Sequence, residues 1–304
     1  MTEQSNFGAK TTADEILAGK NLKGQTVIVT GANTGIGFET ARAFSAVGAR
    51  VIFACRNVVS GNQAVEKTQK LHPGCLAEFL ALDLGSAPGI LAFCETLKAE
   101  EINILICNAG LVATEYQETE QGTEVTVGVS HFGHFLLTRT LLPRLLASGN
   151  PRVVMVSSES HRMPKQLQFE IFPLSKHNFK MMLAYGQAKL CNVLMANELQ
   201  RRYGNEGLTS CSLHPGTMIT TDIGRNSAVM SILMKVISPF TKKPNQGAST
   251  TVFCATHEPV EEVQGLYFSH CKAVKSTTEA NDPVVSAKLW DLSEAWCEQN
   301  AAFQ

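Results

Sequence analysis

The chain has 304 residues, of which 26 are basic and 27 acidic, so its formal net charge at pH 7 is −1. Hydrophobic residues make up 44% of the chain and charged residues 17%, which excludes a largely disordered protein. The balanced charge, without a basic block, argues against broad nucleic-acid binding. No apolar run reaches the roughly 18 residues that a membrane span needs.

Short apolar runs alternate with longer amphipathic stretches along the chain. The expected strands cover residues 27–29, 51–54, 77–82, 104–106, 153–156, 208–213 and 265–268. The expected helices cover residues 36–48, 57–71, 87–100, 122–148, 182–203 and 283–298. This alternation implies parallel strands joined by right-handed crossovers. We therefore predict an α/β fold, a single Rossmann-type doubly wound parallel sheet with helices on both faces.

The composition does not change along the chain, and we find no internal repeat or low-complexity linker. We expect one domain over residues 1–304, with 1–22 as an N-terminal extension. Two segments, 159–181 and 217–245, fit the alternation poorly, and both follow strands. Ligands of open parallel sheets bind beyond the carboxyl ends of the strands. We expect both segments, and above all 217–245, to cover the substrate; core packing or membrane-surface contact are the alternatives for its apolar part.

The nine cysteines show no Cys-x-x-Cys spacing, and several lie inside apolar segments. We interpret them as reduced, buried thiols. The polar residues 1–5 lack the apolar stretch of a secretory signal, so we expect a cytoplasmic protein. His131, His134, His161 and His214 show no metal-ligand spacing, so we expect packed or capping histidines and no metal site.

A glycine-rich turn follows the first expected strand and opens the first helix. Its glycines allow positive φ angles and close approach of a pyrophosphate, and the helix N-terminal amides face the phosphates. This arrangement predicts a dinucleotide site; a purely structural turn is the alternative. The candidate cofactor-binding residues of this turn are Gly31, Asn33, Thr34, Gly35, Ile36 and Gly37.

The second expected strand ends at Arg56, without the acidic residue that NAD enzymes usually place there. A guanidinium binds a phosphate dianion in bidentate fashion, so Arg56 suits the 2′-phosphate of NADP. We predict a preference for NADP(H), with NAD(H) as the alternative. Asp83, after the third strand, is a candidate partner for the adenine amino group; a helix N-cap is the alternative.

Tyr185 and Lys189 stand at positions i and i+4 of an expected helix, and therefore on one face. A nearby lysine cation favours the phenolate and lowers the tyrosine pKa, which suits a general acid/base for alcohol–carbonyl interconversion. Ser158 follows the fifth expected strand. Its hydroxyl is a candidate to hydrogen-bond the substrate oxygen, and a turn or helix cap is the alternative.

The order of these motifs resembles the short-chain dehydrogenase/reductase family over about residues 8–300. The matching residues are Thr30 to Gly37, Asn108-Ala109-Gly110, Ser158, Tyr185, Lys189 and Pro215-Gly216. The resemblance implies that Tyr185 is the catalytic acid/base, that Ser158 orients the substrate oxygen and that Lys189 binds the nicotinamide ribose. It further implies that the cofactor is lined by Asn108, Ala109, Gly110, Tyr185, Lys189, Pro215, Gly216 and Thr217.

Within that family the chain most resembles the retinol-dehydrogenase-like branch, and there the oxidoreductase domain of WW-domain-containing oxidoreductases. Shared phrases include residues 54–57, 156–162 and 189–192. The WW modules and the N-terminal membrane anchor of many retinol dehydrogenases are missing, which suggests a soluble relative. Kinship implies a small apolar alcohol or its aldehyde or ketone, retinoid- or steroid-like, as substrate, and a homodimer through helices 122–148 and 182–203.

One residue departs from the family pattern. Ser130 stands where the family usually has an asparagine that helps to hold a water relaying protons to the lysine. A serine hydroxyl can also hold a water, so we expect a slower enzyme and not an inactive one.

The leading hypothesis is an NADP-dependent oxidoreductase that transfers a hydride, with Tyr185 as acid/base. The first alternative is a catalytically weak NADP(H)-binding regulatory or interaction protein. A Rossmann-type methyltransferase would leave Tyr185, Lys189 and Arg56 without a role. The sequence leaves open the identity of the substrate, the favoured redox direction and the oligomeric state.

Overall fold

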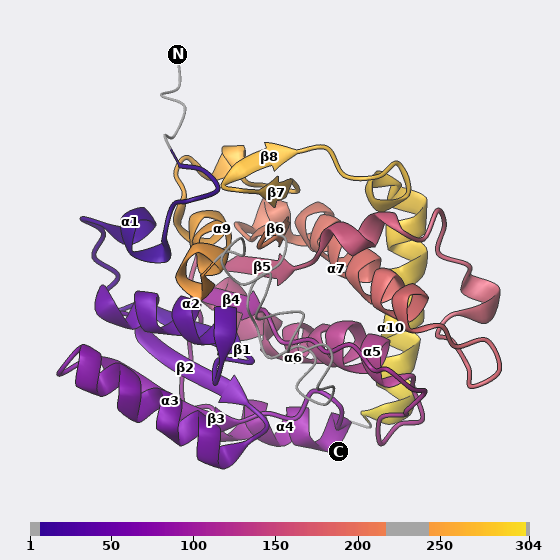
Figure 1. Ribbon diagram of the computed structural model, residues 1–304, viewed down its shortest axis with the longest axis horizontal. Helices are drawn as coiled ribbons and strands as arrows, with labels where there is room; N and C mark the ends of the chain where they lie inside the picture. Colours follow the sequence, from indigo (N-terminus) through magenta and orange to yellow (C-terminus); the bar gives the residue numbers. More distant parts are fainter. Residues whose placement is uncertain (1–6, 217–242, 302–304) are drawn as a thin grey trace, which may run out of the picture.

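The computed structural model describes residues 7–216 and 243–301, which form one eight-stranded sheet in the order β3-β2-β1-β4-β5-β6-β7-β8 (Figure 1). The strands are β1 Thr26–Thr30, β2 Arg50–Cys55, β3 Leu76–Ala81, β4 Ile104–Cys107, β5 Arg152–Val156, β6 Thr209–His214, β7 Tyr267–Ser269 and β8 Lys272–Val274. All neighbours are parallel except β7 and β8. The predicted doubly wound parallel sheet is confirmed, with an antiparallel edge strand that the sequence did not suggest.

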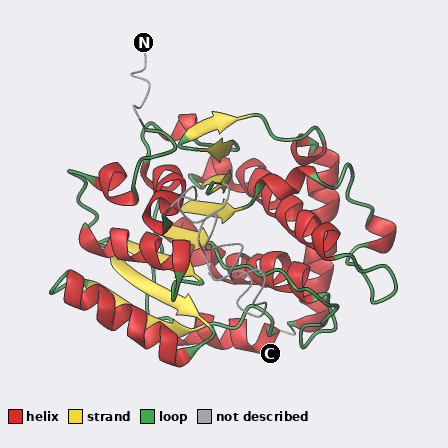
Figure 2. Cartoon of the chain, viewed as in Figure 1, coloured by secondary structure: helices red, strands yellow, loops and turns green. Residues whose placement is uncertain are grey.

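Helices cover both faces of this sheet (Figure 2). The α-helices are α1 Ala13–Leu17, α2 Gly35–Ala46, α3 Val58–Leu71, α4 Ala87–Thr96, α5 Val125–Val127, α6 Gly133–Ala147, α7 Met181–Tyr203, α9 Pro244–Thr256 and α10 Pro283–Asn300. A π-helical turn, η1 Gly128–Phe132, joins α5 to α6. Short 3-10 helices are η2 Glu159–Arg162, η3 Phe169–Ile171, η4 Gly204–Glu206, η6 Val260–Glu262 and η7 Glu279–Asn281.

The apolar residues of each central strand alternate between two cores, because successive side chains of a strand point to opposite faces. Val27 and Val29 of β1 pack in the core formed with α1, α2, α3 and α9. Ile28, between them, packs in the core formed with α4, α6 and α7. Both faces of β1 are therefore fully buried, as the continuous apolar run of a central parallel strand predicts.

The described part of the N-terminal extension belongs to the folded body. Ala13, Ile16 and Leu17 of α1 are buried in the same core as α9. Asp14 pairs with Arg42 of α2 at 2.7 Å, which fastens α1 to that helix. Neither α1 nor α9 was expected from the sequence: α1 is short, and the first residues of α9 belong to a proline-containing stretch that was interpreted as part of the substrate-covering segment.

Helix α10 lies along the side of the molecule, next to α6 and α7 (Figure 1). Its Trp296 stacks on Phe132 of η1, with ring centroids 5.1 Å apart. Its Glu294 forms an ion pair with Arg139 of α6 at 2.5 Å. Helix α10 is therefore fastened to α6, one of the two helices through which the resemblance predicts a homodimer.

The two segments expected to cover the substrate differ in what the structure shows. Residues 159–181 connect β5 to α7 at the carboxyl end of the sheet and contain η2 and η3. The other segment, 217–245, lies outside the described residues except for Lys243–Asn245, where α9 begins. Within the described part of the chain, no helix is both long and apolar enough to cross a membrane.

Candidate active site

The glycine-rich turn between β1 and α2 has the geometry of a phosphate-binding turn. Gly31 and Gly35 have φ angles of 66° and 59°, which side chains other than glycine rarely adopt. Thr34 is the N-cap of α2, but its side chain makes no capping hydrogen bond. The first amides of α2 are therefore not capped by this side chain and suit a pyrophosphate. These features fit the dinucleotide that the sequence predicts here.

Gly37, in the first turn of α2, packs directly on the preceding turn. A Cβ atom at Gly37 would overlap the Gly31 carbonyl oxygen and lie 2.5 Å from Asn108 Nδ2. Both neighbours are fixed, so Gly37→Ala is expected to push α2 away from the turn and to cost about 1–3 kcal/mol of stability. A fall in the melting temperature and in NADPH affinity would support this, measured against Gly8→Ala, where a Cβ meets no atom within 4 Å. An unchanged melting temperature would contradict it.

The turn after β4 is fastened to the glycine-rich turn through Thr30. The Thr30 hydroxyl oxygen accepts hydrogen bonds from the backbone N–H groups of Asn108 and Ala109, both at 2.9 Å. Asn108 Nδ2 donates in return to the Thr30 carbonyl at 2.8 Å. The structure thus brings together the two motifs that the resemblance assigns to the cofactor.

A cavity of about 370 Å³ lies between the carboxyl end of β3 and helix α4. Arg56 and Asp83 both line it, and Arg56 is exposed. Asp83 Oδ1 accepts a hydrogen bond from the Gly85 N–H at 2.9 Å, whereas the N-cap of α4 is Ser86. The alternative that Asp83 caps this helix is therefore wrong. The apolar wall and the two polar side chains fit an adenosine.

Near the glycine-rich turn, Asn33 Nδ2 donates a hydrogen bond to Ser60 Oγ of α3 at 3.0 Å. This bond links the turn to the helix that follows Arg56.

Buried hydrogen bonds at the end of β5 fasten α7 to the sheet. Ser157 Oγ donates to the Lys189 carbonyl oxygen at 2.7 Å. Lys189 Nζ and Asn192 Nδ2 both donate to the Val156 carbonyl oxygen, at 3.0 and 3.1 Å. The Lys189 side chain therefore has a defined position next to the strand end.

Tyr185 lies one turn before Lys189 and forms a side-chain hydrogen bond with Ser158. Ser158 is also the N-cap of η2, because its hydroxyl oxygen accepts the Ser160 N–H at 3.2 Å, so the helix cap given as its alternative role is present. Burial raises the pKa of Tyr185, and the Ser158 hydrogen bond offsets this only in part. Lys189 Nζ is 5.7 Å from the centre of the Tyr185 ring, and burial lowers the pKa of Lys189 to about 8. The prediction that Lys189 lowers the Tyr185 pKa is therefore wrong for this arrangement of side chains. The ammonium group is directed at the Val156 carbonyl, and desolvation dominates at Tyr185.

Ser130 lies in η1 and is fully buried. Its hydroxyl has no hydrogen-bond partner among the residues that the structure describes. A Cβ atom at Gly110 would lie 3.2 Å from Lys189 Nζ and 3.4 Å from Ser130 Oγ, so the two polar groups flank the same small space. The π-helical turn had no signal in the sequence, but such turns are frequent at functional sites.

The remaining predicted cofactor residues follow β6. Pro215 and Gly216 are both buried, and Gly216 has a φ angle of 124°. Thr217 lies outside the described residues. Over residues 7–216 and 243–301, no group of three His, Cys, Asp or Glu side chains is placed to hold a metal ion.

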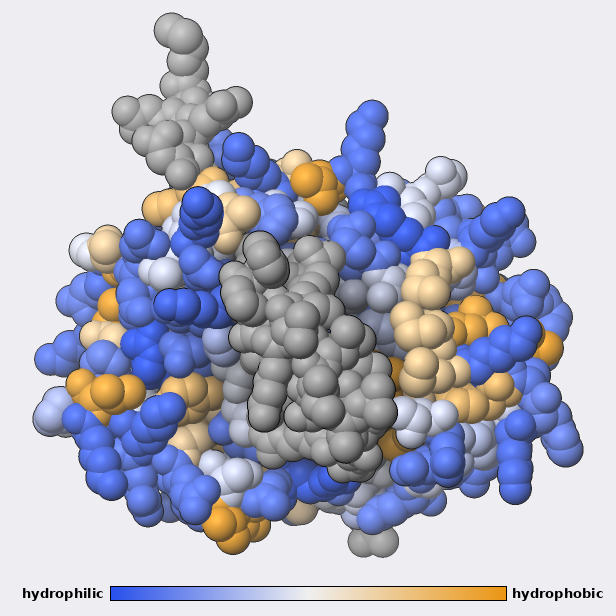
Figure 3. All heavy atoms as spheres, viewed as in Figure 1, coloured by the Kyte–Doolittle hydropathy of each residue, from blue (hydrophilic) through white to orange (hydrophobic). Residues whose placement is uncertain are grey.

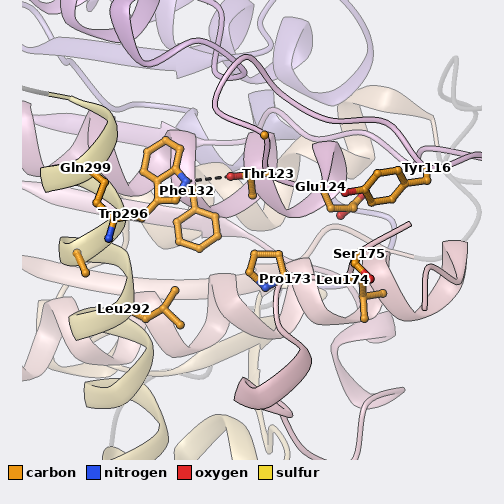
Figure 4. Close-up of a pocket in the computed structure, with 12 residues that line it drawn as sticks. Tyr116, Thr123, Glu124, Phe132, Pro173, Leu174, Ser175, Leu292, Trp296 and Gln299 are labelled. Atoms are coloured by element: carbon orange, nitrogen blue, oxygen red, sulfur yellow. Dashed lines mark hydrogen bonds between the residues drawn. The ribbon is translucent and has the colours of Figure 1, made fainter. Parts of the chain in front are cut away.

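A second cavity, of about 380 Å³, lies between α10 and the segment around Pro173 (Figure 4). Trp296 Nε1 donates to Thr123 Oγ1 at 2.9 Å on its wall. Glu124 contributes to the wall, but both of its carboxylate oxygens accept backbone N–H groups. None of the three candidate catalytic residues lines this cavity.

A Rossmann-type sheet with a glycine-rich turn and a Ser–Tyr–Lys group at the carboxyl ends of its strands defines an oxidoreductase that uses a nicotinamide dinucleotide. The family model described as "short chain dehydrogenase" matches residues 25–230. The chain belongs to this family, as its motifs predicted.

Similar proteins agree with this membership. The chain is 42% identical over 299 residues to the WW domain-containing oxidoreductase of Gallus gallus, covering 96% of this chain and 72% of that protein. It is 40% identical over 274 residues to retinol dehydrogenase 12 of Mus musculus, covering 90% and 86%. A crystal structure of an uncharacterized protein from Mycobacterium Paratuberculosis matches with a TM-score of 0.74 and 29% identity, covering 95% and 98%.

Proposed function

We propose that this protein is an NADP-dependent oxidoreductase that interconverts an apolar alcohol and its aldehyde or ketone. The observation that carries the proposal is the contact of Ser158 with Tyr185, one helical turn from a buried Lys189. Lys189 Nζ lies beside Gly110 of the turn that Asn108 joins to Thr30. These groups are suited to move a proton at a substrate oxygen.

Each residue of the group has one task in carbonyl reduction. The bound nicotinamide supplies the hydride. Tyr185 donates its phenolic proton to the carbonyl oxygen, and Ser158 donates a hydrogen bond that orients the same oxygen. Lys189 would hold the nicotinamide ribose through its ammonium group, which is positioned at the end of β5 by the Val156 carbonyl oxygen.

Exposed methionines around Tyr185 favour an apolar substrate. Met181 and Met182 precede Tyr185 by one turn of α7 and are 37% and 42% exposed, and Met163 of the preceding segment is 51% exposed. Figure 3 shows apolar side chains gathered on the face of the molecule over α7. Methionine adapts to varied apolar ligands. Similarity to retinol dehydrogenase 12 supports a retinoid-like compound.

The preference for NADP(H) over NAD(H) rests on Arg56. Its side chain is exposed at the cavity between β3 and α4, and it forms no ion pair with a carboxylate of the described residues. No acidic residue follows β2 in the sequence to bind a ribose 2′-hydroxyl. A free guanidinium at this point suits a 2′-phosphate.

The proposal is tested by following NADPH and NADH oxidation with a panel of aldehydes and ketones that includes retinal and a ketosteroid. Turnover with an apolar carbonyl, faster with NADPH than with NADH, is expected. Tight NADPH binding without turnover across the panel would favour the alternative, a cofactor-binding regulatory or interaction protein.

The two redox directions are expected to differ in their pH dependence. Because burial raises the pKa of Tyr185, its phenol stays protonated and able to donate through neutral pH. Lys189, with a pKa of about 8, loses its charge above that pH. Carbonyl reduction is therefore expected to be constant below about pH 8 and to fall above it, whereas alcohol oxidation rises with pH because it needs the phenolate. Measured kcat/KM for reduction that rises through pH 8 would contradict this.

Ser130 is the observation that favours the weaker-catalyst alternative, because its short side chain leaves its hydroxyl unpartnered beside Lys189. Ser130→Asn is expected to raise kcat by about two- to tenfold, the effect of one neutral hydrogen bond. Steady-state kinetics with the best carbonyl of the panel measure this. No gain over the parent protein would show that Ser130 does not limit the rate.

A further inference from the structure

We propose that His134 is a positioning residue of this active site, a neutral imidazole that joins the Ser130 carbonyl to the Thr30 hydroxyl. His134 is the second residue of α6 and is fully buried. It lies between the π-helical turn beside Lys189 and the end of β1, where the glycine-rich turn begins. The sequence suggested only a packed or capping histidine at this position.

The hydrogen bonds of the ring define its tautomer. His134 Nδ1 lies 3.0 Å from the Ser130 carbonyl oxygen, which can only accept, so Nδ1 carries the proton. In a neutral ring Nε2 is then an acceptor. The Thr30 hydroxyl has two acceptors within reach, His134 Nε2 at 2.9 Å and the Ile106 carbonyl oxygen at 3.3 Å. We assign its proton to the nearer one, Nε2. The ring therefore has one donor and one acceptor, and both are used.

The same network extends to the cofactor-lining turns. With its proton directed at His134, the Thr30 hydroxyl oxygen has two lone pairs left, and these accept the N–H groups of Asn108 and Ala109. A change at His134 is thus transmitted through one hydroxyl to the Asn108-Ala109-Gly110 turn. On its other side, the ring holds the carbonyl of Ser130, whose hydroxyl shares the space beside Gly110 with Lys189.

The surroundings keep the ring neutral. Burial lowers the pKa of His134 to about 4; the Ser130 hydrogen bond opposes this shift, and the charge of Lys189 adds to it. A second proton on the ring would also direct an Nε2–H at Thr30 and force its hydroxyl to turn. The Thr30 hydroxyl oxygen would then accept Nε2–H with one of its two lone pairs, and the N–H of Asn108 or of Ala109 would lose its acceptor.

Two substitutions separate the hydrogen bond of Nδ1 from that of Nε2. The amide nitrogen of Asn occupies a position near Nδ1 and keeps a donor for Ser130, whereas the amide of Gln reaches the position of Nε2 and keeps an acceptor for Thr30. His134→Asn is therefore expected to weaken NADPH binding by about two- to tenfold. His134→Gln is expected to keep NADPH affinity but to lower kcat by a similar factor and to shift the pH profile of turnover, since each change removes one hydrogen bond.

The matched control is His131→Gln. His131 is equally buried in η1, but its Nε2 lies 2.8 Å from Ser293 Oγ of α10. Its substitution is expected to change the melting temperature and neither the NADPH affinity nor the pH profile. If both His134 variants lose only melting temperature, as this control does, the positioning role is overturned.

A measurement on the unsubstituted protein covers the case in which the variants do not fold. NMR correlation of the imidazole nitrogens is expected to show His134 as the Nδ1–H tautomer throughout neutral pH, and the Nε2–H tautomer or a charged ring would overturn the inference. Only the kcat prediction rests on the proposed function. If the protein binds NADPH but reduces no carbonyl, the proposed function is contradicted. The tautomer of His134 and the NADPH affinities of its variants would still test the positioning role.

Discussion

Replacing Tyr185 by phenylalanine is expected to lower kcat for carbonyl reduction by about 10²–10⁴-fold, the usual contribution of a positioned general acid. The substitution removes only the hydroxyl that forms the hydrogen bond with Ser158. Because the ring stays in place beside Lys189, NADPH is expected to bind as tightly as before. Steady-state kinetics and NADPH fluorescence titration measure the two quantities separately.

The control for this substitution is Tyr203→Phe, at the last residue of the same helix. Tyr203 packs near Trp290 of α10, with ring centroids 6.2 Å apart, and belongs to none of the predicted site motifs. Its substitution is expected to leave kcat unchanged. Full turnover in Tyr185→Phe would show that another group moves the proton.

Replacing Arg56 by alanine is expected to raise the KM for NADPH about tenfold and to leave the KM for NADH nearly unchanged. The guanidinium contributes charge-assisted hydrogen bonds to a 2′-phosphate and none to a ribose hydroxyl. This loss of NADPH affinity is at the low end of the range for a charged hydrogen bond, because the Arg56 side chain is exposed to solvent. Kinetics with both cofactors and one carbonyl substrate measure the ratio.

Arg50→Ala is the matched control, because Arg50 begins the same strand but pairs with Glu78 at 2.8 Å, at the opposite end from the cavity. It is expected to change neither KM. A second variant, Arg56→Glu, is expected to reverse the cofactor preference by repelling the phosphate. Equal losses with NADPH and NADH in Arg56→Ala would mean that the residue supports the cavity and does not recognise the phosphate.

The sheet was predictable because its central strands are continuous apolar runs bounded by turns. Val27 to Val29 and Ile104 to Ile106 are β-branched or leucine residues buried on both faces, a pattern specific to parallel strands. Helix α9 was missed because residues 247–256 are all buried, so apolar residues such as Val252 and Phe253 alternate with no exposed polar face and give no amphipathic period. Strand β8 is short and exposed, and it follows a turn in which Cys271 has a positive φ angle.

The candidate site was predictable as far as local spacing and strand ends define it. The i, i+4 relation of Tyr185 and Lys189 and the position of Ser158 after β5 placed these residues correctly relative to one another. The direction of the Tyr185 pKa shift was not predictable, because it depends on burial and on the Val156 carbonyl that Lys189 contacts. The link through His134 joins residues distant in sequence, and only the fold shows it.

The most direct test of the account is to follow the transferred hydrogen. The protein is incubated with an apolar aldehyde such as retinal and with NADPH in which both hydrogens at the nicotinamide C4 are deuterium, and the alcohol is analysed by mass spectrometry. We expect an alcohol that carries the deuterium, and almost no alcohol from Tyr185→Phe. An alcohol formed without deuterium, or none from any carbonyl that the protein binds together with NADPH, would contradict it.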